Sequence, residues 1–295
     1  MLNTGYIDLE INDWFNRING DNYNKLLKDH KEVEYIHIGP HRTGTKFLQH
    51  NIFPYYYKSK KIFSDDVICG RLFDNGLDHA EKIYNLFPKA KIIAVIRSQP
   101  SIINSVFRTY IKAGGTWNFK NYAKKIIEIR KYDYEELLSK YFQYFGKENC
   151  LVLLYEDLLN TPKEFISSLL SFIEIKHPQK HHIEILSPGP TNIYNELIRW
   201  SNICTRLIFG SSGYLGLDSG QSVQKNSLGE RIRYFCYSKG NSIDKWVIRK
   251  IFNKDILKLQ FRYNSIENEI IAAYAESNRN LEKILQRDLK IYKYP

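Results

Sequence analysis

The sequence predicts an α/β fold in which helices flank a central, mostly parallel sheet. Three observations indicate it: short apolar strands alternate with helical patterns in the first half of the chain, the runs KIIAVI and CLVLLY are continuously apolar, and the second half is mainly helical. Parallel strands between two helical layers are buried on both faces, which explains the continuous apolar runs. We therefore expect a core built from βα units.

Four strands are expected, each followed by a polar or glycine-containing turn. They cover residues 35–39, 61–63, 91–96 and 150–155. Several helical patterns begin at a Pro, Thr, Asn or Asp start signal. The expected helices cover about residues 45–52, 77–86, 100–112, 119–130, 132–145, 162–172, 193–209 and 265–285.

The composition is that of a folded protein with an excess of positive charge. Hydrophobic residues make up 43% of the 295 residues, which excludes a disordered or low-complexity chain. The 43 Lys and Arg residues outnumber the 32 Asp and Glu residues and leave a formal charge of +11. This balance indicates an anionic partner or substrate, such as nucleic acid, an acidic membrane surface, a phosphorylated cofactor or a charged polysaccharide.

The sequence indicates a cytoplasmic protein. No stretch approaches the roughly 18 consecutive apolar residues that cross a bilayer, and the first residues alternate acids with apolar side chains instead of forming a secretion signal. The four cysteines are scattered without a C-x-x-C pair, and Cys150 and Cys204 stand among apolar residues. We expect reduced, buried thiols.

A glycine-containing loop follows the first strand and opens a helix, which is an arrangement that binds phosphate groups. Glycines let the backbone approach an anion, and successive N–H groups at a helix N-terminus form a concave anion site. Arg, Lys and Thr side chains add charged and hydroxyl donors. The loop consists of Gly39, Pro40, His41, Arg42, Thr43, Gly44, Thr45 and Lys46.

This loop departs from the Walker A pattern G-x-x-x-x-G-K-[ST]. Thr45 follows the second glycine and Lys46 comes next, so the lysine and hydroxyl positions are exchanged. A nucleotide triphosphatase also usually carries a carboxylate at the end of another strand to hold Mg²⁺, whereas the strand KIIAVI ends at Arg97. These residues favour a site that binds phosphate directly.

Arg97 and Ser105 indicate a second anion site. Arg97 closes a strand, and Ser105 follows eight residues later on the second turn of the next expected helix. A guanidinium fork and a hydroxyl in these places can converge on one phosphate. By itself the pair is a weak signal, because a surface ion pair and an unrelated helix serine give the same pattern.

Together, these segments resemble the sulfotransferase family that uses 3′-phosphoadenosine-5′-phosphosulfate (PAPS). YIHIGPHRTGTKFLQ resembles the family's 5′-phosphosulfate loop, and IRSQPSIINSVFRTYIKAGGT resembles its 3′-phosphate motif in a bacterial variant. LLYEDLLNTPKEFISSLLSFI and the final segment YAESNRNLEKILQRDLKIYKYP are similar to later parts of bacterial members. The matches span about residues 33–295 in family order. The resemblance implies a P-loop NTPase-like sulfotransferase fold.

The resemblance implies a role for each matching residue. The 5′-phosphosulfate group would be held by Pro40, Arg42, Thr43, Gly44, Thr45 and Lys46. Arg97 and Ser105 would hold the 3′-phosphate that distinguishes this cofactor from ATP. Arg42 and Lys46 would also stabilise charge on the leaving adenosine 3′,5′-bisphosphate. The family usually has Lys at the position of Arg42 and often a second Thr at Lys46, so here the positive charges are placed differently.

We expect one domain over residues 1–295. Within it, residues 1–30 would form an N-terminal extension, residues 31–175 the cofactor-binding α/β core, and residues 176–295 a mainly helical part that closes over the acceptor. Residues 210–229 are rich in Gly and Ser and are the best candidate for a mobile segment. Tyr155, Glu156 and Asp157 are expected to orient the crevice of the sheet structurally and to take no part in the chemistry.

A general base is needed for the acceptor hydroxyl, and three residues are candidates. Asp66 is the first choice, because the carboxyl end of the second strand should face the same crevice as the phosphate loop. Asp65 is an alternative, and either Asp could instead cap the next helix. His41 could act as a base or donate to the anion.

No metal is expected. The cluster His177, His181 and His182 lacks a carboxylate or cysteine companion at ligand spacing, which favours a solvated loop. The expected acceptor is a glycan hydroxyl, because basic charge suits anionic glycans and tyrosines suit stacking on sugar rings. Lipid, small-molecule and peptide acceptors stay open, as does peripheral membrane association.

Two other functions are compatible with parts of the sequence. A nucleotide-dependent kinase could use the same loop, although the exchanged Thr45 and Lys46 and the missing carboxylate disfavour it. A non-enzymatic protein that binds nucleic acid or another polyanion would explain the charge of +11. We expect no nucleic-acid partner, because the two phosphate motifs favour a cofactor pocket.

Overall fold

The computed structural model describes residues 33–65, 68–70, 75–112, 114–175, 192–209 and 264–295. The predictions for the N-terminal extension, Asp66, the histidine cluster and residues 210–229 lie outside these ranges. The chain divides into two compact units. The first comprises Met1–Gln99, Ile129–Ile185 and Tyr274–Pro295, and the second comprises Pro100–Glu128 and Leu186–Ala273.

The first unit contains a parallel sheet with the strand order β2-β1-β3-β4. Its strands are β1 (Tyr35–Ile38), β2 (Ile62–Asp65), β3 (Lys91–Ile96) and β4 (Cys150–Leu154). The chain runs from β1 to β2 on one side and then returns to β3 on the other side of β1. In open parallel sheets, ligands bind at the carboxyl ends of the strands where the order reverses in this way. The topology therefore predicts that a ligand binds at the residues that follow β1 and β3.

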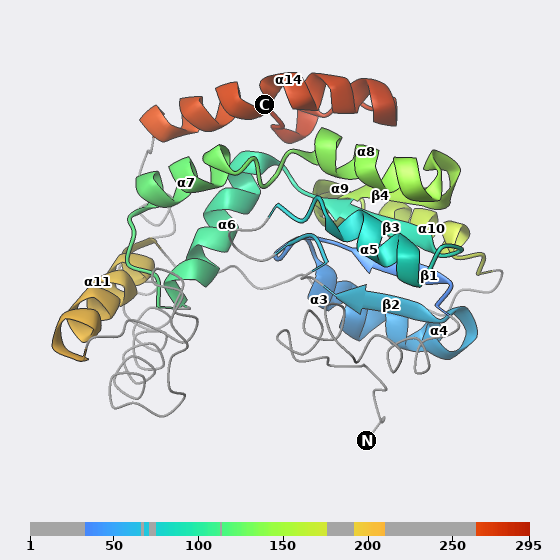
Figure 1. The fold of residues 1–295 in the computed structure, drawn as a ribbon, viewed down its shortest axis with the longest axis horizontal. Helices are drawn as coiled ribbons and strands as arrows, with labels where there is room; N and C mark the ends of the chain where they lie inside the picture. Colours follow the sequence, from blue (N-terminus) through green and yellow to red (C-terminus); the bar gives the residue numbers. More distant parts are fainter. Residues whose placement is uncertain (1–32, 66–67, 71–74, 113, 176–191, 210–263) are drawn as a thin grey trace. The chain divides into compact units, whose positions relative to one another are not determined.

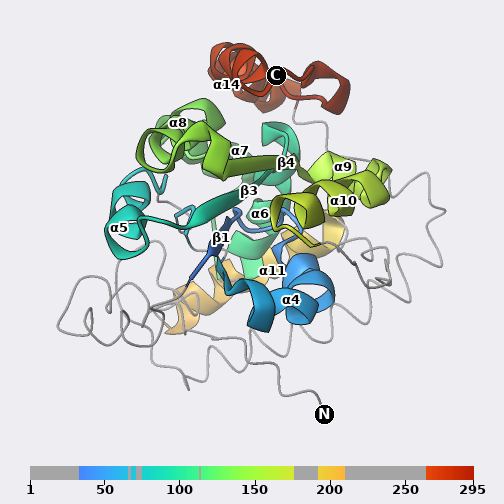
Figure 2. The same ribbon diagram turned by 90° about the vertical axis from the view of Figure 1, so that its right-hand side faces the viewer.

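Helices cover both faces of the sheet (Figure 1; Figure 2). The face that carries α4 and α10 is opposite the face that carries α5 and α8. The helical segments of the first unit are α3 (Thr45–Phe47), the π-helix η1 (Leu48–Ile52), α4 (Phe53–Lys60), α5 (His79–Leu86), α8 (Tyr134–Phe145), the 3₁₀ helix η2 (Lys147–Asn149), α9 (Tyr155–Asn160), α10 (Pro162–Phe172), the end of α14 (Asn264–Leu285) and the 3₁₀ helix η4 (Lys290–Tyr292). This layering is that of the predicted α/β fold.

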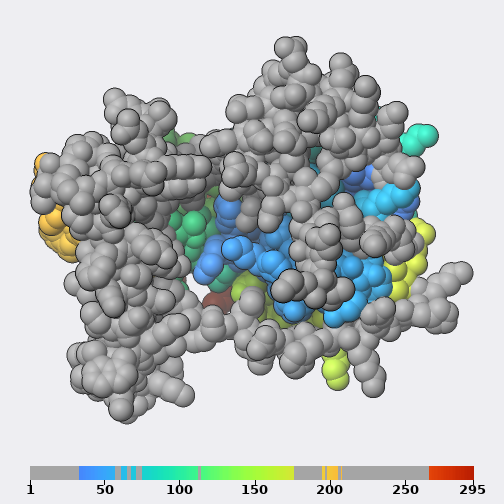
Figure 3. All heavy atoms as spheres, turned by 90° about the horizontal axis from the view of Figure 1, so that it is seen from below, coloured from blue at the N-terminus to red at the C-terminus, as the bar shows by residue number. Residues whose placement is uncertain are grey.

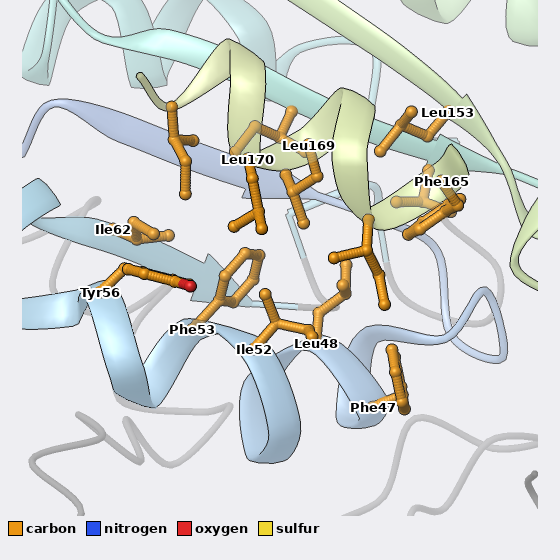
Figure 4. Close-up of a cluster of buried hydrophobic side chains, with 14 of the residues drawn as sticks. Phe47, Leu48, Ile52, Phe53, Tyr56, Ile62, Leu153, Phe165, Leu169 and Leu170 are labelled. Atoms are coloured by element: carbon orange, nitrogen blue, oxygen red, sulfur yellow. The ribbon is translucent and has the colours of Figure 1, made fainter. Parts of the chain in front are cut away.

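A hydrophobic core joins the helix after the phosphate loop to α10 and the sheet (Figure 4). Leu48 and Ile52 are fully buried there, against side chains such as Leu169. Burial of each large aliphatic side chain stabilises the fold by about 1.5–3 kcal/mol. On the outer side of the same helical segment, Pro54 and Tyr55 are exposed, and blue atoms of this part of the chain reach the surface in the view from below (Figure 3). The core therefore fixes the helix that the phosphate loop opens.

The second unit is helical in its described residues. It contains α6 (Gln99–Lys112) from Pro100 onward, α7 (Phe119–Glu128), α11 (Asn192–Phe209) and the start of α14. Aromatic rings form its core: the ring centroids of Phe107 and Phe119 are 5.3 Å apart, and those of Tyr110 and Tyr122 are 5.1 Å apart. The buried Asn202 amide donates to the carbonyl of Ile111 at 2.8 Å and so ties α11 to α6.

Most predicted elements agree with the structure within two residues, and the larger differences have physical reasons. The helix expected over residues 45–52 continues to Lys60, because the buried Phe53 and Tyr56 extend its apolar face. The expectation of a buried thiol at Cys204 is wrong, since this residue lies on an exposed part of α11 beside the exposed Trp200. Within the described ranges, no helix is both long and apolar enough to cross a membrane.

Candidate functional site

The phosphate loop connects β1 to α3 through two left-handed backbone positions. Arg42 has φ 73° and Gly44 has φ 89°. Gly44 precedes α3, and its carbonyl accepts the N–H of Leu48 at 3.1 Å. A Cβ on Gly44 would lie 2.8 Å from Leu158 Cδ2, so α9 packs directly against the loop. Glycine is needed here for its conformation and for space.

The two buried threonines of the loop are in different states. Thr43 Oγ1 donates to the carbonyl of Pro40 at 2.7 Å, so its proton is engaged in closing the loop. Thr45 is 3% exposed, and its Oγ1 has no hydrogen-bond partner among the residues that the structure describes. A buried hydroxyl without a partner costs about 1–3 kcal/mol. Its position at the start of α3 is one at which a bound anion would satisfy it.

Arg97 extends from the end of β3 to the phosphate loop. Its Nη1 donates to the carbonyl of Arg42 at 2.8 Å, and its guanidinium lies 4.4 Å from the centre of the Tyr155 ring. Burial lowers the pKa of Arg97, while the nearby Tyr155 and Glu156 oppose that shift. The side chain remains a cation, because an arginine does not lose its proton in proteins. Arg97 therefore places a fixed positive charge beside the loop.

The first turn of α9 supports the loop and the residue after Arg97. Glu156 Oε1 accepts the backbone N–H of Ser98 at 3.0 Å. Burial raises the pKa of Glu156, and the bond from Ser98 and the charge of Arg97 partly offset this. Asp157 accepts two bonds from the Arg287 guanidinium, at 2.8 and 2.9 Å. Both acids are thus engaged in structural interactions, as the sequence analysis expected.

The other predicted site residues are distributed as follows. Pro40 is buried, His41 is half-buried, and Arg42 and Lys46 are exposed on the loop. Asp65 is the last residue of β2 and pairs in register with Ile38, the residue before the loop. Ser105 is half-buried on α6 in the second unit. Its phosphate-binding role, like the base role of Asp66, remains a prediction.

Two tyrosines support Arg97. Tyr155, which the sequence placed among the structural residues, lies under the guanidinium. The Tyr134 hydroxyl donates to the Arg97 carbonyl at 2.8 Å, and sequence reasoning missed this contact. No local pattern marks Tyr134, which comes from α8.

The arrangement fits a phosphorylated ligand. The loop after β1 and Arg97 after β3 combine a helix N-terminus, an unsatisfied buried hydroxyl and a guanidinium at the point where the strand order reverses. Arg42 and Lys46 add two further cations on the loop. Within the described residues, no group of three or more His, Cys, Asp or Glu side chains could hold a metal ion.

Comparison with known proteins finds a match to one protein family. Residues 71–179 match the model of the Sulfotransferase family, a range that includes β3, Arg97 and α9. The chain is similar to a solved sulfotransferase from Alicyclobacillus acidocaldarius, with 13% identity, a TM-score of 0.42 and coverage of 65% of this chain and 97% of the other. No curated protein matches the chain. The family match covers less than half of the chain, and it supports a sulfotransferase-family domain whose class of chemistry is sulfuryl transfer.

Proposed function

We propose that this chain is a PAPS-dependent O-sulfotransferase whose acceptor is a carbohydrate hydroxyl. The observation that carries the proposal is the combination of a helix-opening loop, the unsatisfied hydroxyl of Thr45 and the guanidinium of Arg97 at one edge of the sheet. A donor with both a 5′-phosphosulfate and a 3′-phosphate has an anion for each of the two motifs.

In this proposal, the loop holds the 5′-phosphosulfate group through the backbone around Pro40 to Gly44 and the hydroxyl of Thr45. Arg97 holds the 3′-phosphate, and Ser105 is proposed as its second donor on the sequence resemblance. The bound donor supplies the activated sulfuryl group. Arg42 and Lys46 neutralise the charge that grows on the leaving bisphosphate, and fixed charges of this kind stabilise a transition state without reorganisation.

A carboxylate at the end of β2 is proposed to accept the proton of the acceptor hydroxyl. Asp66 remains the first choice, with Asp65 and His41 as alternatives. The register of β2 supports a base from this segment, because Asp65 is level with Ile38 and so ends the strand at the edge that bears the phosphate loop. Positioning the hydroxyl in line with the sulfuryl group would supply a further part of the acceleration.

The proposed donor needs no metal. At the end of β3, where a metal-dependent phosphoryl transferase usually carries an acid, this chain has Arg97, and Thr45 and Lys46 are exchanged relative to a Walker A loop. The basic charge of +11 supports an anionic glycan as acceptor.

The test is a turnover assay in EDTA with PAPS and a panel of oligosaccharide, phenol and peptide acceptors. We expect release of adenosine 3′,5′-bisphosphate together with a sulfated oligosaccharide. Arg97→Ala should lower kcat/KM about thirtyfold, since loss of a charged hydrogen bond to phosphate costs about 2 kcal/mol. Arg279→Ala, which removes an exposed arginine of α14, is the matched control and should have no effect. Turnover only with Mg·ATP and a phosphorylated product would instead establish a kinase.

A further inference from the structure

Residues 97–99, which we call the Arg97–Gln99 turn, are each held by a side chain from elsewhere in the first unit. The Tyr134 hydroxyl donates to the Arg97 carbonyl at 2.8 Å, and Arg97 N–H donates back to it at 3.4 Å. Glu156 accepts the N–H of Ser98 at 3.0 Å. The backbone on which Arg97 stands is therefore bonded on both sides of its Cα.

The third residue of the turn is held by an amide pair. Gln99 Nε2 donates to Asn278 Oδ1 at 2.9 Å, and Asn278 Nδ2 donates to Gln99 Oε1 at 3.1 Å. Gln99 is 0% exposed and Asn278 is 1% exposed, so neither amide exchanges its partner for bulk water. Asn278 Nδ2 also reaches the carbonyl of Pro295 at 3.3 Å.

The final residues of the sequence complete this network. Tyr294 is 4% exposed, and its hydroxyl donates to Glu156 Oε2 at 3.3 Å. The two oxygens of the Glu156 carboxylate thus have different partners, because Oε1 binds the turn and Oε2 binds Tyr294. Arg287 and Asp157 form a two-bond ion pair one residue along α9, which fixes the path of residues 287–294 beside that helix.

The Arg97 side chain depends on the direction in which this turn leaves β3. Its guanidinium reaches the Arg42 carbonyl at 2.8 Å and lies 4.4 Å from the centre of the Tyr155 ring. Removing one hydrogen-bond donor from a carboxylate in a buried site costs more free energy than that bond contributes. The remaining donors must then stabilise the whole negative charge. Removal of the Tyr294 hydroxyl should therefore alter how firmly Ser98 and Arg97 are held.

We infer that Tyr294 and Asn278 are positioning residues of the anion site: through Glu156 and Gln99 they hold the Arg97–Gln99 turn so that Arg97 faces the phosphate loop. Neither residue needs to touch a ligand. This inference rests on the proposed function for the identity of the anion, but the positioning itself is a property of the fold.

The experiment compares Tyr294→Phe with Tyr141→Phe. Tyr141 is also fully buried in the first unit, and its hydroxyl has no partner among the described residues, so this control removes a buried hydroxyl that does not support the turn. Calorimetry gives the dissociation constants for adenosine 3′,5′-bisphosphate and for adenosine 5′-monophosphate. Tyr294→Phe should weaken bisphosphate binding about fivefold with little change for the monophosphate, and Tyr141→Phe should change neither.

Two further measurements separate positioning from a general loss of stability. In an Arg97→Ala background, Tyr294→Phe should have no additional effect on bisphosphate affinity, because the two residues act through one contact. Amide hydrogen exchange should be faster at Ser98 in Tyr294→Phe than in the wild type or in Tyr141→Phe. An exchange rate at Ser98 that Tyr294→Phe leaves unchanged would overturn the inference. So would an equal loss of bisphosphate affinity through Tyr294→Phe in the presence and in the absence of Arg97. If the wild type does not prefer the bisphosphate, the proposed function fails, and the exchange rate at Ser98 still decides whether Tyr294 holds the turn.

Discussion

Thr43 and Thr45 show how two residues of the same type divide structural and binding roles within one loop. Thr43 donates its proton to the Pro40 carbonyl, and Thr45 is buried with its hydroxyl unsatisfied among the described residues. An unsatisfied buried polar atom lowers stability, and at the start of a helix a bound anion can satisfy it. Arg97 donates to the Arg42 carbonyl and lies over the Tyr155 ring, which places its positive charge beside the loop.

Replacing each threonine by the isosteric valine separates these roles. Thr45→Val should leave the free energy of unfolding unchanged or slightly higher and should weaken binding of adenosine 3′,5′-bisphosphate, because only the ligand uses its hydroxyl. Thr43→Val should cost about 1 kcal/mol of stability, because the buried Pro40 carbonyl loses its donor. Urea unfolding and calorimetry on both variants provide the check. Equal destabilisation by the two substitutions would show that Thr45 has a structural partner.

Glu156 gives the stability a defined pH dependence. Its folded pKa is raised above the ordinary value of 4.5, chiefly by burial, so the folded protein binds this proton more tightly than the unfolded chain does. Stability linked to Glu156 is therefore fully present below pH 4.5 and falls as pH rises to the raised pKa, above which the cost of the buried charge is complete.

Glu156→Gln removes this titration and keeps an oxygen for Ser98 and an amide for Tyr294. The free energy of unfolding of the variant minus that of the wild type should increase as pH rises from about 4.5. Above the raised pKa of Glu156 this difference should become constant. Urea titrations at a series of pH values measure it. Parallel curves for the two proteins would contradict the assignment.

At the scale of elements, the phosphate loop depends on the contact between α3 and α9. Gly44→Ala should lower the free energy of unfolding by about 1–2 kcal/mol, because a Cβ is disfavoured at its left-handed φ, and the contact with Leu158 adds to this. It should also weaken anion binding, since Gly44 directly precedes α3. Thermal unfolding and calorimetry with adenosine 3′,5′-bisphosphate test both effects.

Gly146→Ala is the control for that substitution. Gly146 also has a left-handed φ, of 82°, but it lies between α8 and β4, before the amino end of that strand. The control should lose stability and keep wild-type affinity for the anion. If both variants lost affinity to the same extent, the claim that Gly44 supports anion binding through the conformation of the phosphate loop would be wrong.

Elements with local signals could be predicted from the sequence. The helix α10 begins at Pro162 and ends at Phe172 as expected, because a proline start signal and amphipathic spacing are both contained within it. Strand β2 was predicted too short, since Ser64 and Asp65 are polar and join the sheet through their backbone pairing with β1. The phosphate loop was found for the same reason as α10: its glycines and donors lie together in the sequence.

Contacts over long sequence distances could not be predicted. Tyr294 meets Glu156 across 138 positions, and Asn278 meets Gln99 across 179. Neither residue has a pattern that distinguishes it from other buried Tyr or Asn side chains. The different roles of Thr43 and Thr45 were equally inaccessible, because they depend on which hydroxyl turns toward the Pro40 carbonyl.

The whole molecule combines an excess of positive charge with one specific candidate anion site. A charge of +11 attracts any polyanion, and such binding falls steeply with salt because counterions are released. Arg97 and the phosphate loop belong to the first unit, together with the tyrosines and acids that hold them. Binding in a site of this kind depends on particular hydrogen bonds as well as on net charge.

Titration calorimetry with adenosine 3′,5′-bisphosphate in EDTA tests whether Arg97 and the phosphate loop bind this nucleotide. ATP and adenosine 5′-monophosphate serve as nucleotide controls, and Arg97→Ala and Arg279→Ala as matched variants. The account predicts metal-independent binding that requires the 3′-phosphate, persists at moderate salt and is lost with Arg97 but not with Arg279. No binding, or a preference for Mg·ATP, would contradict it.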